Sequence, residues 1–228
     1  MKTLILIPAR TGSKGLPGKN IKVLDEKPLI AHTFAFAKQV CSQLDCICVS
    51  SNDDQVIELA LKYDINVPFK RPEHLANDTA GMYEVIMHAL DFYEDKDEKF
   101  DAVLLLQPTS PFRILEDYNK MFDMFDSDCD MIVSVKESKA NPYFNLFEDI
   151  DDGYLQMSKP SDYKTRQECP KVYNYNGSMY LIKTESLRKS NIVGFKKIKK
   201  LLMPEERSVD IDTMIDWIVA EHYLRERN

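Results

Sequence analysis

The sequence lacks several features that define large classes of proteins. It contains no apolar run approaching the ~20 residues that a membrane-spanning helix requires. Because an apolar segment begins at residue 3, we expect no secretory leader. The formal net charge of -7 argues against a general nucleic-acid-binding protein. We therefore expect a cytoplasmic protein with neither a membrane nor a nucleic acid as its partner.

Cysteine pairs of the C-x-x-C type are also missing. The chain has five cysteines, an odd number, and Cys46 and Cys48 alternate within an apolar run where buried thiols are expected. This usage is typical of reduced cysteines that neither form disulfides nor bind a metal. The length of 228 residues fits one domain that carries a smaller excursion.

Two widespread nucleotide-binding motifs are absent as well. A Walker A loop has four residues between its glycines, whereas five separate Gly12 from Gly18, and no G-x-G-x-x-G occurs. In their place, a glycine-rich loop at residues 8–20 directly follows the apolar run 3–7. Its backbone N–H groups are suited to surround an anion, and it carries three cations: Arg10, Lys14 and Lys19. A turn with solvated charges is the alternative, but the end of a buried strand favours a polyphosphate site.

Apolar runs and helical periodicities alternate along the first 135 residues, which predicts a mostly parallel sheet between two layers of helices. The fold class is therefore α/β, a three-layer Rossmann-like sandwich in a single domain, residues 1–228. The expected strands are residues 3–7, 46–50, 102–106, 131–135, 178–183 and 199–203. The expected helices are residues 28–40, 53–63, 78–90, 114–125 and 212–224, the last with Ile215, Ile218, Val219 and Leu224 placed for burial.

Residues 137–176 interrupt this alternation. They are rich in Pro, Tyr, Asp and Lys, and residues 151–153 (DDG) read as a hairpin turn. We interpret the segment as an excursion from the sheet that serves as a lid or as a dimerisation arm.

Two carboxylates, Asp210 and Asp212, stand two positions apart just before the last helix. In an extended segment both point to the same side, with Val209 and Ile211 opposite. Paired carboxylates next to a polyphosphate suit Mg²⁺, which takes one or two carboxylates and fills its shell with waters and phosphate oxygens. The alternative is that Asp212 caps the last helix, and one residue can serve both purposes.

A polar turn that contains two prolines follows the apolar run 102–106. Gln107, Thr109 and Ser110 lie where a sheet of this type presents side chains to a substrate, although an ordinary loop explains them equally well. Arg166 and Asn176 lie in or just after the excursion. Such an arginine is usually solvated, and it becomes interesting only if the substrate is a carboxylate.

Five ordered segments together resemble the acylneuraminate cytidylyltransferases, and the resemblance runs nearly from end to end. The segments are residues 9–20, 71–80, 105–113, 175–180 and 204–213. The resemblance implies a nucleotidyltransferase that moves CMP from CTP to the anomeric hydroxyl of a nine-carbon 2-keto sugar acid, such as N-acetylneuraminate, and releases pyrophosphate with the help of Mg²⁺. Related enzymes are homodimers in which such an arm reaches over the neighbour's site.

The resemblance also assigns roles to residues of this chain. The CTP-binding residues would be Ala9, Arg10, Gly12, Ser13, Lys14, Lys19, Asn20, Arg71, Thr79 and Ala80. The sugar-acid-binding residues would be Gln107, Thr109, Ser110, Arg166, Asn176 and Tyr180. Asp210 and Asp212 would hold the metal, and the catalytic set would be Arg10, Lys14, Lys19 and Asp212.

Two alternatives stay open at this stage. The substrate is a different keto sugar acid of the legionaminate, pseudaminate or Kdo type, or the chain is a nucleotide-sugar-binding protein without catalysis. The chain also carries Gly81-Met82 where the family often has two serines.

Overall fold

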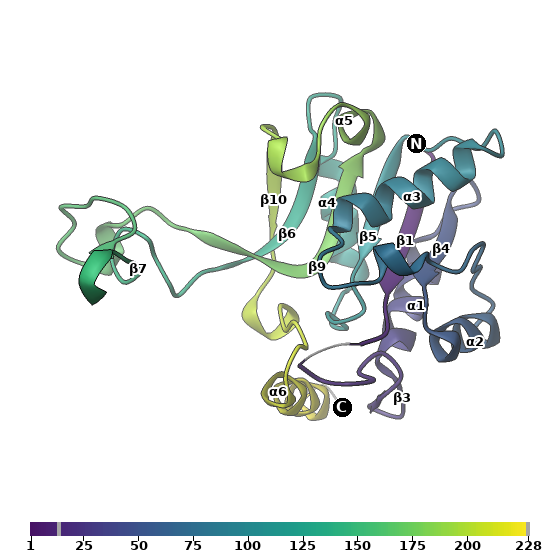
Figure 1. The fold of residues 1–228 in the computed structure, drawn as a ribbon, viewed down its shortest axis with the longest axis horizontal. Helices are drawn as coiled ribbons and strands as arrows, with labels where there is room; N and C mark the ends of the chain where they lie inside the picture. Colours follow the sequence, from purple (N-terminus) through teal and green to yellow (C-terminus); the bar gives the residue numbers. More distant parts are fainter. Residues whose placement is uncertain (13–14, 227–228) are drawn as a thin grey trace.

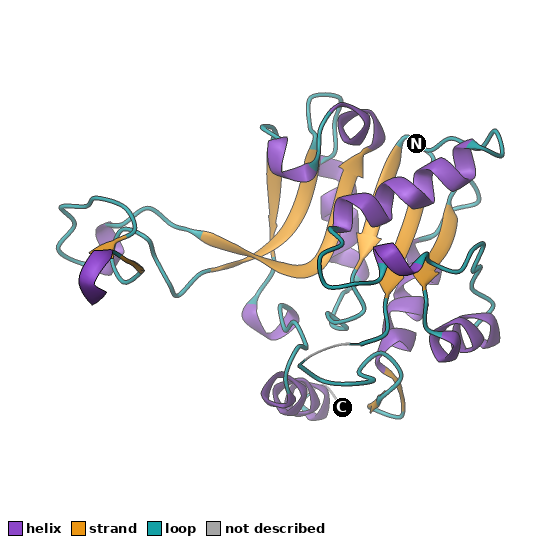
Figure 2. Cartoon of the chain, viewed as in Figure 1, coloured by secondary structure: helices purple, strands orange, loops and turns teal. Residues whose placement is uncertain are grey.

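A computed structural model of the chain describes residues 1–12 and 15–226. Within these ranges the main sheet has six strands in the order β10-β6-β9-β5-β1-β4 (Figures 1 and 2). β1 pairs in parallel with β4 and β5, β10 pairs in parallel with β6, and β9 runs antiparallel between β5 and β6. The strands are β1 (Thr3–Ala9), β4 (Cys46–Ser51), β5 (Ala102–Leu106), β6 (Met131–Glu137), β9 (Tyr173–Lys183) and β10 (Ile198–Leu202).

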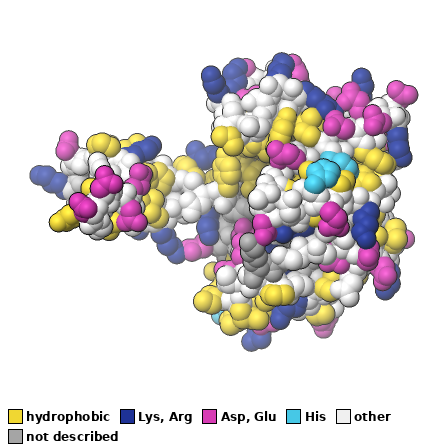
Figure 3. Space-filling model, in the orientation of Figure 1, with side chains coloured by type: hydrophobic (Ala, Val, Ile, Leu, Met, Phe, Trp, Pro, Cys, Tyr) yellow, Lys and Arg dark blue, Asp and Glu magenta, His cyan; other side chains and the backbone are white. Residues whose placement is uncertain are grey.

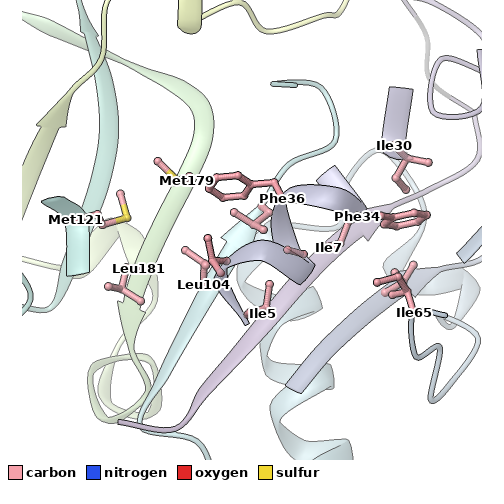
Figure 4. Close-up of a cluster of buried hydrophobic side chains, with 14 of the residues drawn as sticks. Ile5, Ile7, Ile30, Phe34, Phe36, Ile65, Leu104, Met121, Met179 and Leu181 are labelled. Atoms are coloured by element: carbon pink, nitrogen blue, oxygen red, sulfur yellow. The ribbon is translucent and has the colours of Figure 1, made fainter. Parts of the chain in front are cut away.

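Helices cover both faces of the sheet, as the continuous apolar runs of its central strands require. Along β1, Ile5 and Ile7 face one layer while Leu4 and Leu6 face the other. The first layer contains α1 (Leu29–Val40), α2 (Asp54–Lys62) and α4 (Leu115–Met124). Figure 4 shows buried side chains of α1 and α4 next to those of the strands. The second contains α3 (Met82–Glu94), which lies in front of the sheet in Figure 1, and α5 (Thr184–Lys189). The predicted three-layer α/β sandwich with a mostly parallel sheet is confirmed.

Among the described residues, no helix is long and apolar enough to cross a membrane. Several short elements complete the fold. The small strands are β2 (Val23–Leu24), β3 (Lys27–Pro28), β7 (Phe147–Asp149) and β8 (Leu155–Met157). The 3-10 turns are Glu73–Leu75, Asp151–Gly153, Arg166–Glu168, Ile192–Gly194 and Glu205–Arg207.

One predicted helix start was wrong. The helix expected from Asp78-Thr79 begins at Met82, with Gly81 as its N-cap. The side-chain oxygen of Asn77 accepts hydrogen bonds from the backbone N–H groups of Thr79 and Ala80, at 3.0 and 2.8 Å. A side chain that bonds to nearby backbone in this way holds the segment in a turn and delays the helix.

The arm, residues 138–172, projects from the body on the extended ends of β6 and β9 (Figure 1). It is slightly shorter than the predicted excursion, because Glu137 still pairs with Tyr173. The predicted turn at Asp151–Gly153 is confirmed, since it joins the antiparallel pair β7 and β8. Apolar side chains lie uncovered among the charges of the arm in Figure 3, and those exposed are Phe144, Leu146, Phe147, Ile150, Tyr154, Leu155 and Tyr163.

The last helix, α6 (Met214–Arg225), differs from its prediction in two ways. Its N-cap is Thr213, which forms a capping box with Asp216, so Asp212 is not the capping residue. Three of the side chains expected to be buried are exposed instead: Ile215 (73%), Ile218 (59%) and Val219 (38%). The helix packs through a different stripe, in which Trp217 and Ala220 are buried and Leu224 is partly buried against them.

A buried arginine fixes the end of β5 against β9. Arg113 is 8% exposed and donates its hydrogen bonds to the carbonyl oxygens of Gln107 and Ser178 and to the hydroxyl of Thr33. Burial lowers the pKa of Arg113, and the charge of Asp210 opposes that shift. The guanidinium therefore holds two backbone segments together through donors that are largely withdrawn from water.

We predict that Arg113→Met lowers the free energy of unfolding by about 2–5 kcal/mol, because it leaves buried carbonyl groups without donors. The measurement is urea denaturation. Arg188→Met is the control, since Arg188 binds Asp91 and Glu94 at the surface, where such pairs contribute about 1 kcal/mol or less. Equal losses for the two variants would contradict the role given to Arg113.

Candidate active site

A cavity of about 420 Å³ opens at the edge of the sheet where β1 and β5 end. The carboxyl ends of parallel strands are the usual ligand-binding edge of such a sheet. The lining residues come from five separate parts of the chain. They are Pro8, Ala9, Arg10, Gly15, Lys19, Asn20, Arg71, Met82, Gln107, Pro108, Thr109, Asp210 and Asp212.

The glycine-rich loop forms one wall and is tied to the distant segment that precedes α6. Lys19 is only 9% exposed, and its Nζ donates to the carbonyl oxygen of Ile211 at 2.9 Å and to Oδ1 of Asp212 at 2.6 Å. A Cβ atom at Gly15 would lie 2.3 Å from the carbonyl oxygen of Asp212, so glycine is required for this close approach. Two residues predicted to bind CTP, Ser13 and Lys14, lie outside the described residues.

The rest of the predicted loop set lies at or beside the cavity. Gly12 has φ +74°, a conformation that favours glycine. It lines a small hollow next to the cavity together with Arg10, Lys19 and Asn20. Arg10 is held from outside by Asp78, whose Oδ1 accepts from the guanidinium at 2.8 Å.

Arg71 provides a second buried cation on the same side. It is 4% exposed and donates to the hydroxyl and the carbonyl oxygen of Ser50 at the end of β4. Burial, and then the charge of Arg10, lowers the pKa of Arg71 to about 10. Two guanidinium groups that repel each other across a cavity favour an anionic ligand between them.

The predicted residues Thr79 and Ala80 are not among the residues that line this cavity. The turn made by Asn77 holds both of them at the protein surface. Met82, at the start of α3, lines the cavity instead. In the sequence, the Gly81-Met82 pair was the only indication that Met82 lines the cavity.

Asp210 and Asp212 face the cavity, with Ile211 buried between them, as an extended segment predicts. The N–H of Ile211 donates to the carbonyl oxygen of Thr109 at 2.8 Å, which fixes the segment against the polar turn. Desolvation raises the pKa of Asp210, and the nearby charge of Asp212 adds to the shift. Both effects indicate that a positive charge next to Asp210 would be favourable.

The carboxylates of Asp210 and Asp212 fit Mg²⁺ only when a ligand supplies further oxygen atoms. Among the described residues, no group of three or more His, Cys, Asp or Glu side chains is arranged to hold a metal ion. Two carboxylates are nevertheless enough for Mg²⁺ when phosphate oxygens and waters complete its shell.

The predicted sugar-side residues divide into two groups. Gln107 and Thr109 line the cavity, whereas the side chains of Ser110 and Asn176 point into the protein. The hydroxyl of Ser110 donates to the carbonyl oxygen of Asn176, and the amide of Asn176 binds Ser134 and Ser208. Both residues therefore position the site from behind, and direct contact with a substrate is not available to them as they stand.

Tyr180 and Arg166 also lie away from the cavity lining. Tyr180 is partly buried beside Tyr175, and burial raises its pKa to about 12. Arg166 lies in the arm, where it donates to the carbonyl oxygen of Ser138 at 3.3 Å. It lines a different cavity of about 440 Å³ at the root of the arm.

Sequence reasoning missed Gly177 as a site residue, although it lies within the segment 175–180 that contributes to the family resemblance. This glycine has φ +70°, and a Cβ there would lie 2.9 Å from both Oδ2 of Asp210 and Oε1 of Gln107. A glycine inside a strand pattern signals a bulge or a close approach, and this was the available sign.

The sequence profile of the cytidylyltransferase family matches residues 4–218. The chain belongs to the cytidylyltransferase family. Members of the family are nucleotidyltransferases, and the assignment made from the motifs is confirmed.

Several curated proteins are similar over nearly the whole chain. Flagellin modification protein B of Campylobacter coli is 34% identical over 99% of this chain and 96% of its own length. A CMP-N,N'-diacetyllegionaminic acid synthase of Legionella pneumophila is 35% identical over 98% of this chain and 97% of its own length. An N-acylneuraminate cytidylyltransferase of Streptococcus agalactiae is 33% identical over 96% of this chain and 52% of its own length.

Two solved structures share the fold. A CMP-2-keto-3-deoxy-manno-octonic acid synthetase complexed with CTP superposes with a TM-score of 0.72 at 17% identity and covers all of both chains. A 4-diphosphocytidyl-2C-methyl-D-erythritol synthase from Anaerococcus prevotii superposes with a TM-score of 0.68 at 18% identity and covers 98% of each chain.

The pKa of Asp210 generates a prediction about stability. Because the folded state raises this pKa, ionisation of Asp210 opposes folding. The penalty is absent below the unfolded pKa, grows as the pH rises toward the folded pKa, and is complete above it. In the absence of ligands, Asp210→Asn should therefore raise the Tm at pH 7, and the gain should shrink in acid.

Asp130→Asn is the control of opposite sign. A hydrogen bond from Ser186, followed by one from the backbone of Lys197, lowers the pKa of Asp130, so its ionised form stabilises the fold. This variant should lower the Tm at pH 7. Thermal melts between pH 3 and 8 decide the matter, and a lower Tm for Asp210→Asn at pH 7 contradicts the prediction.

Proposed function

We propose that this cytidylyltransferase transfers CMP from CTP to the anomeric hydroxyl of a nine-carbon 2-keto sugar acid and releases pyrophosphate, with Mg²⁺ as cofactor. One observation carries the proposal: a single cavity is lined by the cations of Arg10, Lys19 and Arg71 and by the carboxylates of Asp210 and Asp212. Cations suit a triphosphate, and a pair of carboxylates suits the metal ion that accompanies it.

The residues of this chain act mainly by position and charge. Arg10 and Lys19 stabilise negative charge on the phosphates, and Lys14 is proposed to do the same. Lys19 already lies 2.6 Å from Asp212, so it also holds that carboxylate at the cavity wall. Gln107 and Thr109 line the same cavity just after β5 and would orient the sugar acid.

Asp210 and Asp212 would hold Mg²⁺ together with phosphate oxygens of CTP. The ion supplies positive charge that neutralises the triphosphate and favours attack at the α-phosphorus. Both carboxylates line the same cavity as the cations that would bind the phosphates.

The acid we propose first is of the N,N'-diacetyllegionaminate type. The full-length relatives named as legionaminate synthases from Legionella pneumophila and Campylobacter jejuni, at 35% and 32% identity, support this choice. N-Acetylneuraminate, the substrate first expected from the motifs, and pseudaminate are the competing acids.

The test is pyrophosphate release with CTP, UTP, ATP or GTP against a panel of the three acids, with and without Mg²⁺. We expect turnover with CTP and Mg²⁺, and highest kcat/KM with the legionaminate-type acid. Comparable turnover with UTP or ATP would refute the nucleotide assignment, and no turnover with any acid would refute the reaction.

Two lysines of the loop region give a matched pair of variants for the same assay. Lys19→Met should lower kcat/KM by about 100-fold or more, the size typical for loss of one charge-stabilising donor. Lys22→Met should leave it unchanged, because Lys22 lies over the ring of Trp217, 4.7 Å from its centroid. An equal loss of kcat/KM in the two variants would show that Lys19 acts only through the stability of the loop.

We also propose that the protein is a homodimer in which the arm of one copy reaches the cavity of the other. The exposed apolar side chains of the arm support a partner surface. Arg166 lies outside the cavity of its own chain, so a role in binding the carboxylate of the acid requires a second copy.

Arg166→Ala should therefore raise the KM for the sugar acid by about 30-fold or more and leave the KM for CTP nearly unchanged. Lys164→Ala, an exposed neighbour in the arm, is the control. Sedimentation should give a dimer at micromolar concentration. A monomer would refute the assembly, and an unchanged KM for the acid would refute the role of Arg166.

A further inference from the structure

Gly177 lies in an irregular part of β9 beside the cavity. Val133 and Val135 of β6 pair with Tyr180 and Tyr175 of β9, so a step of two residues on one strand is matched by five on the other. The extra residues of β9 bulge out of the ladder where β5 ends. Bulges of this kind often lie next to active sites, where they redirect the chain.

Two site side chains occupy the space above Gly177. A Cβ atom on this residue would lie 2.9 Å from Oδ2 of Asp210 and 2.9 Å from Oε1 of Gln107. These atoms are the ends of side chains that come from different segments, one before α6 and one after β5. The atoms that a methyl group at residue 177 would meet first therefore belong to a carboxylate and an amide, and both would have to move.

The backbone around Gly177 is held too firmly to absorb the change. The neighbouring Asn176 is 2% exposed and accepts from the hydroxyl of Ser134 at 2.6 Å while it donates to Ser208 at 2.9 Å. Its carbonyl oxygen accepts from Ser110 at 3.1 Å. Buried polar groups with all of these partners are costly to move, so the displacement falls on Asp210 and Gln107.

We propose that Gly177 is a positioning residue that sets the Asp210 carboxylate and the Gln107 amide together, because its missing side chain leaves one space that both of them fill. The inference rests on the proposed function, in which Asp210 helps to hold the metal ion. The inference goes beyond the proposed function, because one backbone position would determine the placement of a side chain on the metal side and of another on the sugar side of the cavity.

The test compares Gly177→Ala with Gly153→Ala. Both glycines have positive φ, +70° and +78°, so both variants carry the same kind of backbone strain. Only Gly177 has neighbours that a Cβ would meet, since nothing lies within 4 Å of a Cβ at Gly153. The difference between the two variants therefore isolates the displacement of the side chains.

The main readout is binding of Mn²⁺, used in place of Mg²⁺, to the protein with CTP, followed by electron paramagnetic resonance. Gly177→Ala should weaken Mn²⁺ binding by about 10-fold or more, the range seen when a group that orients a metal ligand is lost. The KM for the sugar acid should rise as well. Gly153→Ala should bind Mn²⁺ like the unaltered protein. Its Tm should fall to an extent comparable with the fall for Gly177→Ala, because both substitutions strain a backbone with positive φ.

A double variant keeps the inference open to refutation. Gln107→Ala combined with Gly177→Ala removes one of the two groups that crowd the new methyl, so Asp210 regains space and Mn²⁺ binding should recover in part. Mn²⁺ affinity of Gly177→Ala equal to that of the unaltered protein would overturn the inference. So would a Gly177→Ala protein that does not fold, because the backbone would then be what rejects the side chain.

The same measurements separate this inference from the proposed function. If the unaltered protein shows no Mn²⁺ binding that depends on CTP and no release of pyrophosphate, the proposed function fails, whatever the variants do. If the unaltered protein shows both and Gly177→Ala matches it, the function stands and the role of Gly177 falls.

Discussion

The cavity depends on a buried cation that binds backbone. Arg113 donates to the carbonyl oxygens of Gln107 and Ser178, which belong to the turn after β5 and to the bulge of β9. A guanidinium group out of water must have its donors satisfied, so these two segments have one low-energy arrangement. That arrangement sets Gln107 and Gly177 side by side, and Asp210 then fits over Gly177.

Charge in the cavity is arranged differently from charge on the surface. Surface lysines such as Lys70 and Lys197 pair with neighbouring carboxylates and are largely screened by water. In the cavity, Arg10 and Arg71 repel each other, and the pKa of Asp210 is raised. Under the proposed function, the phosphates of the nucleotide and the accompanying metal ion would supply charges that offset both effects.

The sequence predicted the layers, the glycine loop and the two carboxylates because each depends on local pattern. Ser110 was predicted to contact the substrate because a polar residue at a strand end looks the same in sequence whether it faces a ligand or a buried partner. Asn176 was predicted to do so because the family resemblance gave it that role. Ile215 and Ile218 were predicted to be buried because periodicity shows that a stripe is apolar without showing what covers it. The bulge at Gly177 arises from the pairing of β9 with two other strands, which depends on contacts far apart in the chain.

The bond from Lys19 to Asp212 joins residues 193 positions apart. A ribosome makes the chain from its amino end, so the glycine loop exists long before the carboxylates that complete its wall. At ~5–20 residues per second, roughly 10–40 s separate the synthesis of these two residues. The contact between Lys19 and Asp212 is thus possible only after residue 212 has been made, so the proposed nucleotide site depends on nearly the whole chain.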